Sequence, residues 1–225
     1  QTTVPVADPL PSWQEGAAKA GIIDFVRRVT DRESPDFVAE PARVAVFDHD
    51  GTLIVERPTL VQFEFVYHRV RELAPAHPEW AGIQPFRSVL EDDRAGLAAM
   101  GYRRRAALID AGQGNLFQAD FEAAAAQFLA TARHTRFDAR YIDLTYTPMF
   151  ELLRYLAAHD FRVYSVSGGG IDFIRTMSAG NYALPRERVI GSSTKSALRE
   201  RDGRVAVYRK TGFRSLNVGP FKPLN

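Results

Sequence analysis

Residues 43–53 read RVAVFDHDGTL, and this stretch decides the fold that the sequence predicts. Val44 to Phe47 form a short, continuously apolar run, which is typical of a strand buried on both faces of a parallel sheet. Asp48 and Asp50 follow directly, and at an extended strand end their side chains point the same way. Gly51 then permits a sharp backbone turn. Because open α/β sheets bind ligands at the carboxyl ends of their strands, the two carboxylates mark a candidate site.

A second apolar strand with a polar end lies further along the chain. Residues 163–170 read VYSVSGGG, so this strand ends at Ser167 and runs into three glycines. Together the two stretches resemble motifs I and II of the haloacid dehalogenase-like superfamily of phosphohydrolases, in its phosphoserine-phosphatase-like branch. Either motif alone could be an ordinary turn after a strand. The resemblance implies a doubly wound, Rossmann-like α/β core, formed by residues 1–54 and 147–225, with an inserted all-helical cap over residues 55–146.

The resemblance also implies a mechanism and a set of site residues. Asp48 would be the nucleophile that forms an aspartyl-phosphate, and Asp50 would pass a proton to the leaving alcohol and later take one from water. Mg²⁺ is the implied cofactor, held by the Asp48 carboxylate and the Asp50 carbonyl. Free amides at a helix N-terminus favour an anion, so the loop after the second strand is expected to cradle the phosphate. The implied phosphate-binding residues are Thr52, Ser167, Gly168 and Gly169.

A third motif of the superfamily is a lysine that stabilises the charge of the phosphorylated aspartate. Residues 219–223, GPFKP, resemble the G-x-G-K-P segment of a bacterial phosphatase-like subfamily, with Phe221 in place of its second glycine. This favours Lys222 as the catalytic lysine, followed by Lys210. A solvated surface charge is the alternative for either one.

Two departures from the family pattern bear on function. The family's substrate-reading Glu is replaced by Arg57, with Glu56 one place early, which argues against phosphoserine as the substrate. The acidic fourth motif, which supplies a further metal ligand, has no counterpart, because no Asp or Glu follows Asp202. The expected core therefore lacks its last strands, and the chain is interpreted as truncated or degenerate. The favoured function is a phosphomonoesterase, and the alternative is an inactive relative that binds a phosphorylated ligand or a partner protein.

Several local signals predict the remaining elements. The S-x-x-E pattern of Ser12 and Glu15 predicts a helix over residues 12–30. Residues 55–146 show helical periodicity and no strand-like stretch, and the arginines at 103–105 are read as a solvated face or as an attractor for an anionic substrate. Asp202-Gly203 predicts the turn of a small hairpin.

Composition excludes some classes of function. The 225 residues include 29 Lys and Arg against 27 Asp and Glu, a net charge of +2 that does not indicate a nucleic-acid-binding surface. No apolar run is long enough to span a membrane, and the absence of cysteine excludes disulfides and thiolate metal sites. The polar, proline-containing start without Met favours a periplasmic or secreted protein, with the cytoplasm as the alternative. The expected partner is a small phosphorylated substrate, and the oligomeric state is left open.

Overall fold

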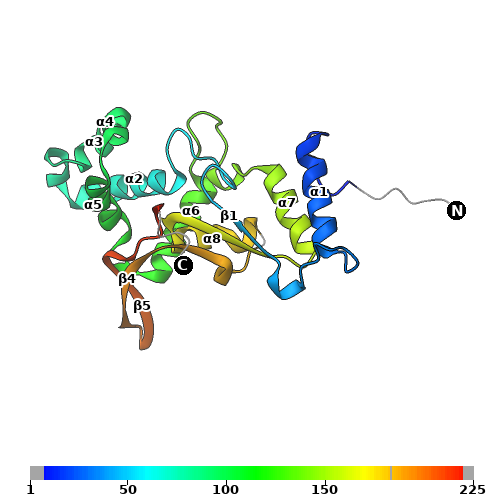
Figure 1. The fold of residues 1–225 in the computed structure, drawn as a ribbon. Coiled ribbons are helices and arrows are strands. Elements are labelled where there is room, and N and C mark those ends of the chain that lie inside the picture. The colour runs from blue at the N-terminus through cyan, green and yellow to red at the C-terminus, as the bar shows by residue number, and fades with distance from the viewer. Residues whose placement is uncertain (1–7, 183, 220–225) are drawn as a thin grey trace.

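The computed structural model describes residues 8–182 and 184–219 (Figure 1). In this part of the chain a five-stranded sheet has the strand order β1-β3-β4-β5-β2. Strands β1, β3 and β4 are parallel, whereas β5 and β2 are added in antiparallel pairing. A mainly parallel sheet packed with helices confirms the predicted α/β class. The strands are β1 (Val44–Phe47), β2 (Leu116–Phe117), β3 (Arg162–Gly170), β4 (Val189–Arg201) and β5 (Arg204–Ser215).

Helices α1 (Ala17–Thr30), α7 (Thr147–Ala158) and α8 (Ile171–Asn181) flank the parallel strands. The predicted capping box is wrong, because α1 begins after Gly16 and Ser12 donates both its backbone N–H and its hydroxyl to Glu151. This pair of hydrogen bonds ties the segment before α1 to α7. Among the described residues, short 3-10 helices lie at Glu40–Ala42, Ala74–Ala76, Pro78–Gly82, Tyr141–Asp143 and Arg186–Arg188.

The segment between β1 and α7 is helical, as predicted, except for the two-residue strand β2. Strand β2 pairs with β5, so the insertion and the hairpin share one sheet. This corrects the expectation of an all-helical cap, because two residues are too few to leave a periodic signal in the sequence. Its helices are α2 (Val61–Leu73), α3 (Phe86–Leu90), α4 (Arg94–Ala99), α5 (Tyr102–Gln113) and α6 (Gln118–Thr131).

Two apolar clusters divide the interior. The larger one joins α1, α7 and α8 to α6 and to the face of α2 that carries Phe65. The smaller one lies wholly in the insertion, between the face of α2 that carries Val66 and Val70 and the helices α3 to α5. Helix α2 therefore contributes to both clusters and α6 belongs to the main core. The division into a core and a cap at residues 54 and 147 stays a prediction.

Strand β1 is not buried on both faces, and this part of the sequence interpretation was wrong. Ala45 and Phe47 pack against the larger cluster, whereas Val44 and Val46 are 47% and 59% exposed. Successive side chains alternate between the two faces of a strand, and in the described part of the chain only one face of β1 is covered. An unbroken apolar run cannot reveal this difference.

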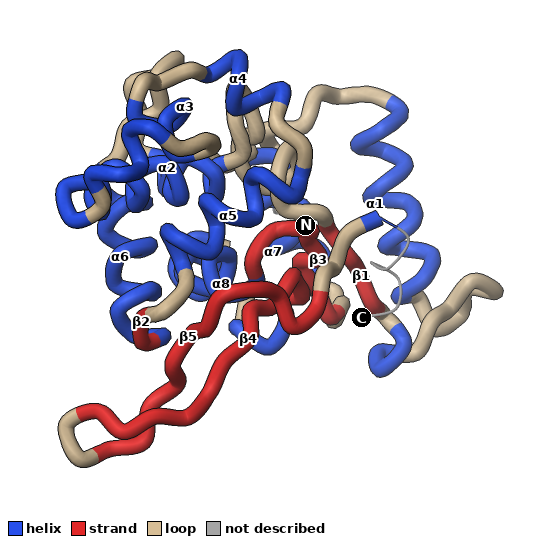
Figure 2. Tube along the Cα trace, turned by 90° about the vertical axis from the view of Figure 1, so that its left-hand side faces the viewer, coloured by secondary structure: helices blue, strands red, loops and turns tan. Residues whose placement is uncertain are grey.

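The predicted hairpin is present and is longer than expected. Asp202 and Gly203 both have positive φ values, 53° and 73°, which is the backbone that a tight two-residue hairpin turn requires. Strand β4 runs from Val189 directly into the hairpin, and both views show the arm protruding from the body of the protein (Figures 1 and 2). None of the helices in the described residues has the length and apolar character that a membrane span requires.

Candidate functional site

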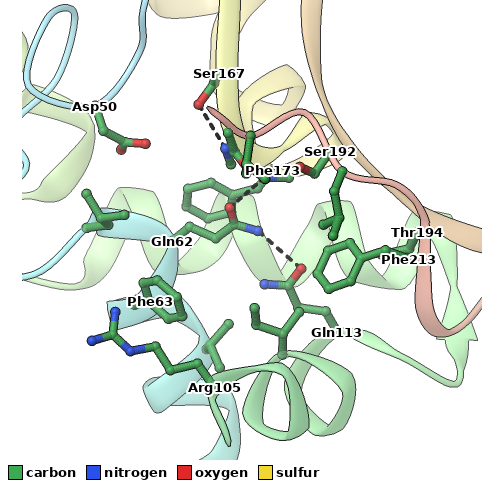
Figure 3. Close-up of a pocket in the computed structure, with 18 of the residues that line it drawn as sticks. Asp50, Gln62, Phe63, Arg105, Gln113, Ser167, Phe173, Ser192, Thr194 and Phe213 are labelled. Atoms are coloured by element: carbon green, nitrogen blue, oxygen red, sulfur yellow. Dashed lines mark hydrogen bonds between the residues drawn. The ribbon is translucent and has the colours of Figure 1, made fainter. Parts of the chain in front are cut away.

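A cavity of about 530 Å³ lies where the carboxyl ends of β1 and β3 meet the helical insertion (Figure 3). Its size is typical of small-molecule sites, which span about 300–1,000 Å³. Of the predicted residues, Thr52 does not line this cavity, Lys210 is exposed on the hairpin, and Lys222 lies outside the described residues. The predicted residues that do line it are Asp48, Asp50, Ser167, Gly168 and Gly169.

The turn after β1 holds the two aspartates at the mouth of the sheet. Gly51 has a φ of 73° and donates its N–H to the Ile54 carbonyl at 2.8 Å, while the His49 carbonyl accepts from Leu53 at 2.8 Å. A side chain at Gly51 would place a Cβ 2.7 Å from the Glu56 carboxyl carbon. The predicted turn therefore needs glycine at residue 51 for its positive φ, whereas the flexible Glu56 side chain could move away from an added Cβ.

Between the two aspartates, His49 points into the protein and has a buried partner. Its Nε2 lies 2.9 Å from the Tyr182 hydroxyl, and its Nδ1 lies 3.5 Å from an Asp50 carboxylate oxygen. Burial raises the pKa of Tyr182, and the negative charge of Asp50 adds to the rise, so the phenol stays protonated. No local pattern relates His49 to Tyr182, although strand alternation predicts that residue 49 points opposite to residues 48 and 50.

The glycine loop after β3 already uses two of its amides. The Ser167 hydroxyl accepts the Gly169 N–H at 3.0 Å, and the Gln62 side-chain oxygen accepts the Gly170 N–H at 2.7 Å. Gln62 comes from the first turn of α2, so the insertion contacts the proposed phosphate cradle directly. The spacing of the motifs gave no signal for this contact.

The same loop is supported from behind by β4 and by the segment after β5. Ser192 donates its hydroxyl to the Gly168 carbonyl at 2.9 Å, and Asn217 donates its side-chain N–H to the Ser167 carbonyl at 2.7 Å. At Gly191 an added Cβ would lie 2.8 Å from the Gly169 carbonyl oxygen and 3.0 Å from the Ile171 nitrogen. Both contacts are with backbone, so the loop position depends on a glycine at 191.

We expect Gly191→Ala to destabilise the protein by about 1–3 kcal/mol, the usual cost of an overpacked site, and to weaken the binding of inorganic phosphate. Urea unfolding measures the first effect, and calorimetric titration with inorganic phosphate measures the second. The matched control is Gly180→Ala on α8, where the added Cβ meets no atom within 4 Å, and which should leave phosphate binding unchanged. Equal behaviour of the two variants would show that the loop can move away from β4 without loss.

Among the described residues, the cations that line the cavity are two arginines, and the prediction of Lys222 stays untested. Arg209 of β5 is buried, lies 2.5 Å from the Asp172 carboxylate and donates to the Gln113 carbonyl at 3.0 Å. Arg105 of α5 donates to the Ala98 carbonyl at 2.8 Å. Arg105 lines the cavity together with Ile109 and Gln113, which follow it at four-residue intervals on α5. This helical spacing is the feature of the sequence that could have indicated that one arginine of 103–105 faces inward.

The donor set fits Mg²⁺ in part. Mg²⁺ takes one or two carboxylates together with water and phosphate oxygens, and Asp48 and Asp50 line the same cavity. Asp172 lines it too, but its carboxylate pairs with Arg209. Within the described ranges no group of three or more His, Cys, Asp or Glu side chains is placed to hold a metal ion. The pair of aspartates therefore offers a site that water and a bound phosphate would have to complete.

Comparison with known proteins supports the fold. No family model and no curated protein matches the chain. One similar solved structure is a conserved, functionally unknown protein from Anaerococcus prevotii, at 13% identity and a TM-score of 0.53, covering 92% of this chain and 74% of that one. This likeness shows a shared fold and no more.

Two further solved structures overlap less well with the chain. A phosphoserine phosphohydrolase-like protein from Francisella tularensis has 19% identity and a TM-score of 0.36, covering 72% of this chain and 62% of its own. A cytosolic 5'-nucleotidase IIIB bound to cytidine has 14% identity and a TM-score of 0.37, and the match covers 88% of this chain and 58% of that one. The chain thus spans less than two thirds of the length of these two proteins. Their TM-scores are below 0.5, so nothing is inferred from them about the function of this chain.

Proposed function

We propose that this chain is a phosphatase that hydrolyses phosphate monoesters of small metabolites. One observation carries the proposal: Asp48 and Asp50 line the same cavity as Ser167, which lies far from them in the sequence, at the carboxyl ends of β1 and β3. Their resemblance to motifs I and II of haloacid dehalogenase-like phosphohydrolases supports the same chemistry.

The proposed reaction has two steps. In the first, an Asp48 carboxylate oxygen attacks phosphorus, the bond to the alcohol oxygen breaks, and Asp50 gives that oxygen a proton. In the second, Asp50 takes a proton from water, the water oxygen attacks phosphorus, and inorganic phosphate leaves Asp48. Ser167 and the neighbouring loop amides would hold the phosphoryl oxygens. To do so, the amides of Gly169 and Gly170 would give up their hydrogen bonds to Ser167 and Gln62 and donate to the phosphoryl oxygens.

The charge of the cavity supports the need for a cation. Among the described residues, four carboxylates line it, those of Asp48, Asp50, Glu56 and Asp172, against the two guanidinium groups of Arg105 and Arg209. A phosphate dianion placed there would meet net negative charge, which costs binding free energy. Mg²⁺ held by the Asp48 carboxylate and the Asp50 carbonyl would supply the opposing charge when bound.

The test is hydrolysis of p-nitrophenyl phosphate by the purified protein. We expect turnover with millimolar Mg²⁺, loss of turnover when the metal is chelated, and recovery on readdition. Equal rates with and without chelator would remove the metal from the proposal.

The second candidate function is binding of a phosphorylated ligand without turnover. It is favoured by the lack, in the described part of the chain, of a third metal-binding side chain beside the two aspartates. Tight binding of a phosphate analogue together with no hydrolysis under any metal would support this candidate over the phosphatase.

A further inference from the structure

The cavity has two chemically different halves. In Figure 3, Asp50 and Ser167 lie on one side of Gln62, and Phe63, Arg105 and Gln113 lie on the other. The second half is also bordered by apolar side chains of the insertion and of β5, which are Val66, Met100, Ile109 and Phe213. The first half suits the phosphoryl group, so the second half is where the alcohol part of a substrate would lie.

A chain of hydrogen bonds fixes the orientation of two side-chain amides at the border between the halves. The backbone N–H of Gly170 can only donate, so the Gln62 group that faces it, at 2.7 Å, must be the oxygen. The nitrogen of Gln62 then faces Gln113 at 3.3 Å, and the group of Gln113 that accepts it must also be the oxygen. The usual ambiguity between oxygen and nitrogen in a glutamine amide is thereby resolved.

The Gln113 nitrogen is left as a buried donor without a partner among the described residues. Gln113 is 2% exposed, and its Nε2 has no hydrogen-bond partner in this part of the chain. In Figure 3 this nitrogen points away from Gln62, toward the side of the cavity where Phe63 lies. A buried, unpaired N–H costs free energy that an acceptor on a ligand would recover.

The walls around this donor suit a ring and not a small cationic group. The guanidinium of Arg105 lies 5.2 Å from the centre of the Phe63 ring, and aromatic and aliphatic side chains complete the surface. Flat apolar groups pack well against such rings. An ammonium placed here would lose its water and lie in the same half of the cavity as the positive charge of Arg105, and burying a charge without a partner is costly.

We infer that the proposed phosphatase acts on monoesters whose alcohol carries an apolar ring with a neutral hydrogen-bond acceptor, and that Gln113 determines this specificity by donating to that acceptor. The inference rests on the proposed function and refines it. The acceptor could be a ring nitrogen or a carbonyl oxygen, since both accept from an amide N–H.

The experiment compares esters of primary alcohols, whose leaving groups have similar intrinsic reactivity. The probes are 2-phenylethyl phosphate, the 3- and 4-pyridyl analogues of it, and O-phosphoserine, at a pH where pyridine is neutral. We expect kcat/KM to be about tenfold higher for the better pyridyl ester than for the phenyl ester, since only the former satisfies the Gln113 donor, and to be lowest for O-phosphoserine.

The variant Gln113→Leu removes the donor and should lower the pyridyl-to-phenyl ratio from about ten to about one. The ratio is independent of the fraction of folded enzyme, so partial misfolding does not obscure it. Gln127→Leu, an exposed position on α6, is the matched control and should keep the ratio of the wild type.

Three results would overturn the inference, and they can be told apart. If the wild type prefers the phenyl ester or treats all ring esters alike, Gln113 does not read an acceptor. If O-phosphoserine is the best substrate, the class of alcohol is wrong while the phosphatase proposal stands. If neither these esters nor p-nitrophenyl phosphate is hydrolysed, the proposed function fails and the inference fails with it.

Discussion

Replacing Asp48 with Asn should lower the turnover of p-nitrophenyl phosphate by on the order of 10⁴-fold or more, because a covalent nucleophile cannot be bypassed. The substitution keeps the size and shape of the side chain. One carboxylate oxygen of Asp48 now accepts the His49 backbone N–H at 2.9 Å, and the amide oxygen of Asn can accept the same bond. The loss of activity would therefore report on the missing carboxylate and not on a collapsed turn.

The matched control for this prediction is Asp202→Asn at the tip of the hairpin. It makes the same chemical change at a side chain that is 93% exposed, and Asn tolerates the positive φ of 53° found there. We expect activity within about twofold of the wild type, because the change is remote from the cavity and surface charges are well screened. If Asp48→Asn retains activity within about tenfold, Asp48 is not the nucleophile and the two-step mechanism falls.

Replacing Phe65 with Ala should lower the free energy of unfolding by about 3–5 kcal/mol, the usual cost of removing a buried aromatic ring. Phe65 is fully buried on α2, and its ring centre lies 5.3 Å from that of Phe173 in a stacked pair. It also meets Phe121 at 5.7 Å and Phe128 at 5.5 Å, both on α6. Phe173 follows the glycine loop closely, so the same ring links the insertion to the proposed phosphate cradle.

Urea denaturation followed by circular dichroism measures this loss. Because α2 and α6 share the main core, we expect one cooperative transition and not separate unfolding of the insertion. The control is Phe25→Ala on α1, where the side chain is 46% exposed and the expected cost is below about 1 kcal/mol. Equal costs for the two variants, or a separate early transition in the wild type, would show that the insertion does not depend on this aromatic cluster.

Local patterns in the sequence were sufficient for the elements whose cause is local. The apolar run before Asp48 and the run before Ser167 predicted β1 and β3. Such a strand end, an apolar run followed by a polar residue, is a pattern of consecutive residues and is therefore visible in the sequence. Asp202-Gly203 predicted the hairpin turn for the same reason, since the positive φ values favour these two residue types. The parallel pairing of β1 with β3, which brings Asp48 and Ser167 to one edge, was expected from the family resemblance, and the long connection between the two strands permits it.

The other features depended on which elements pack together, and only the tertiary structure decided them. The sequence could not show that Val44 and Val46 are exposed on one face of β1, because valine is compatible with a strand position whether or not a helix covers it. Gln62 and Gln113 acquire their roles only when α2 and α5 are folded onto the glycine loop, because hydrogen bonds between them join residues that no local spacing relates. Arg209 faces the cavity because β5 pairs with β4, and side-chain direction in a strand is fixed by pairing and not by residue type.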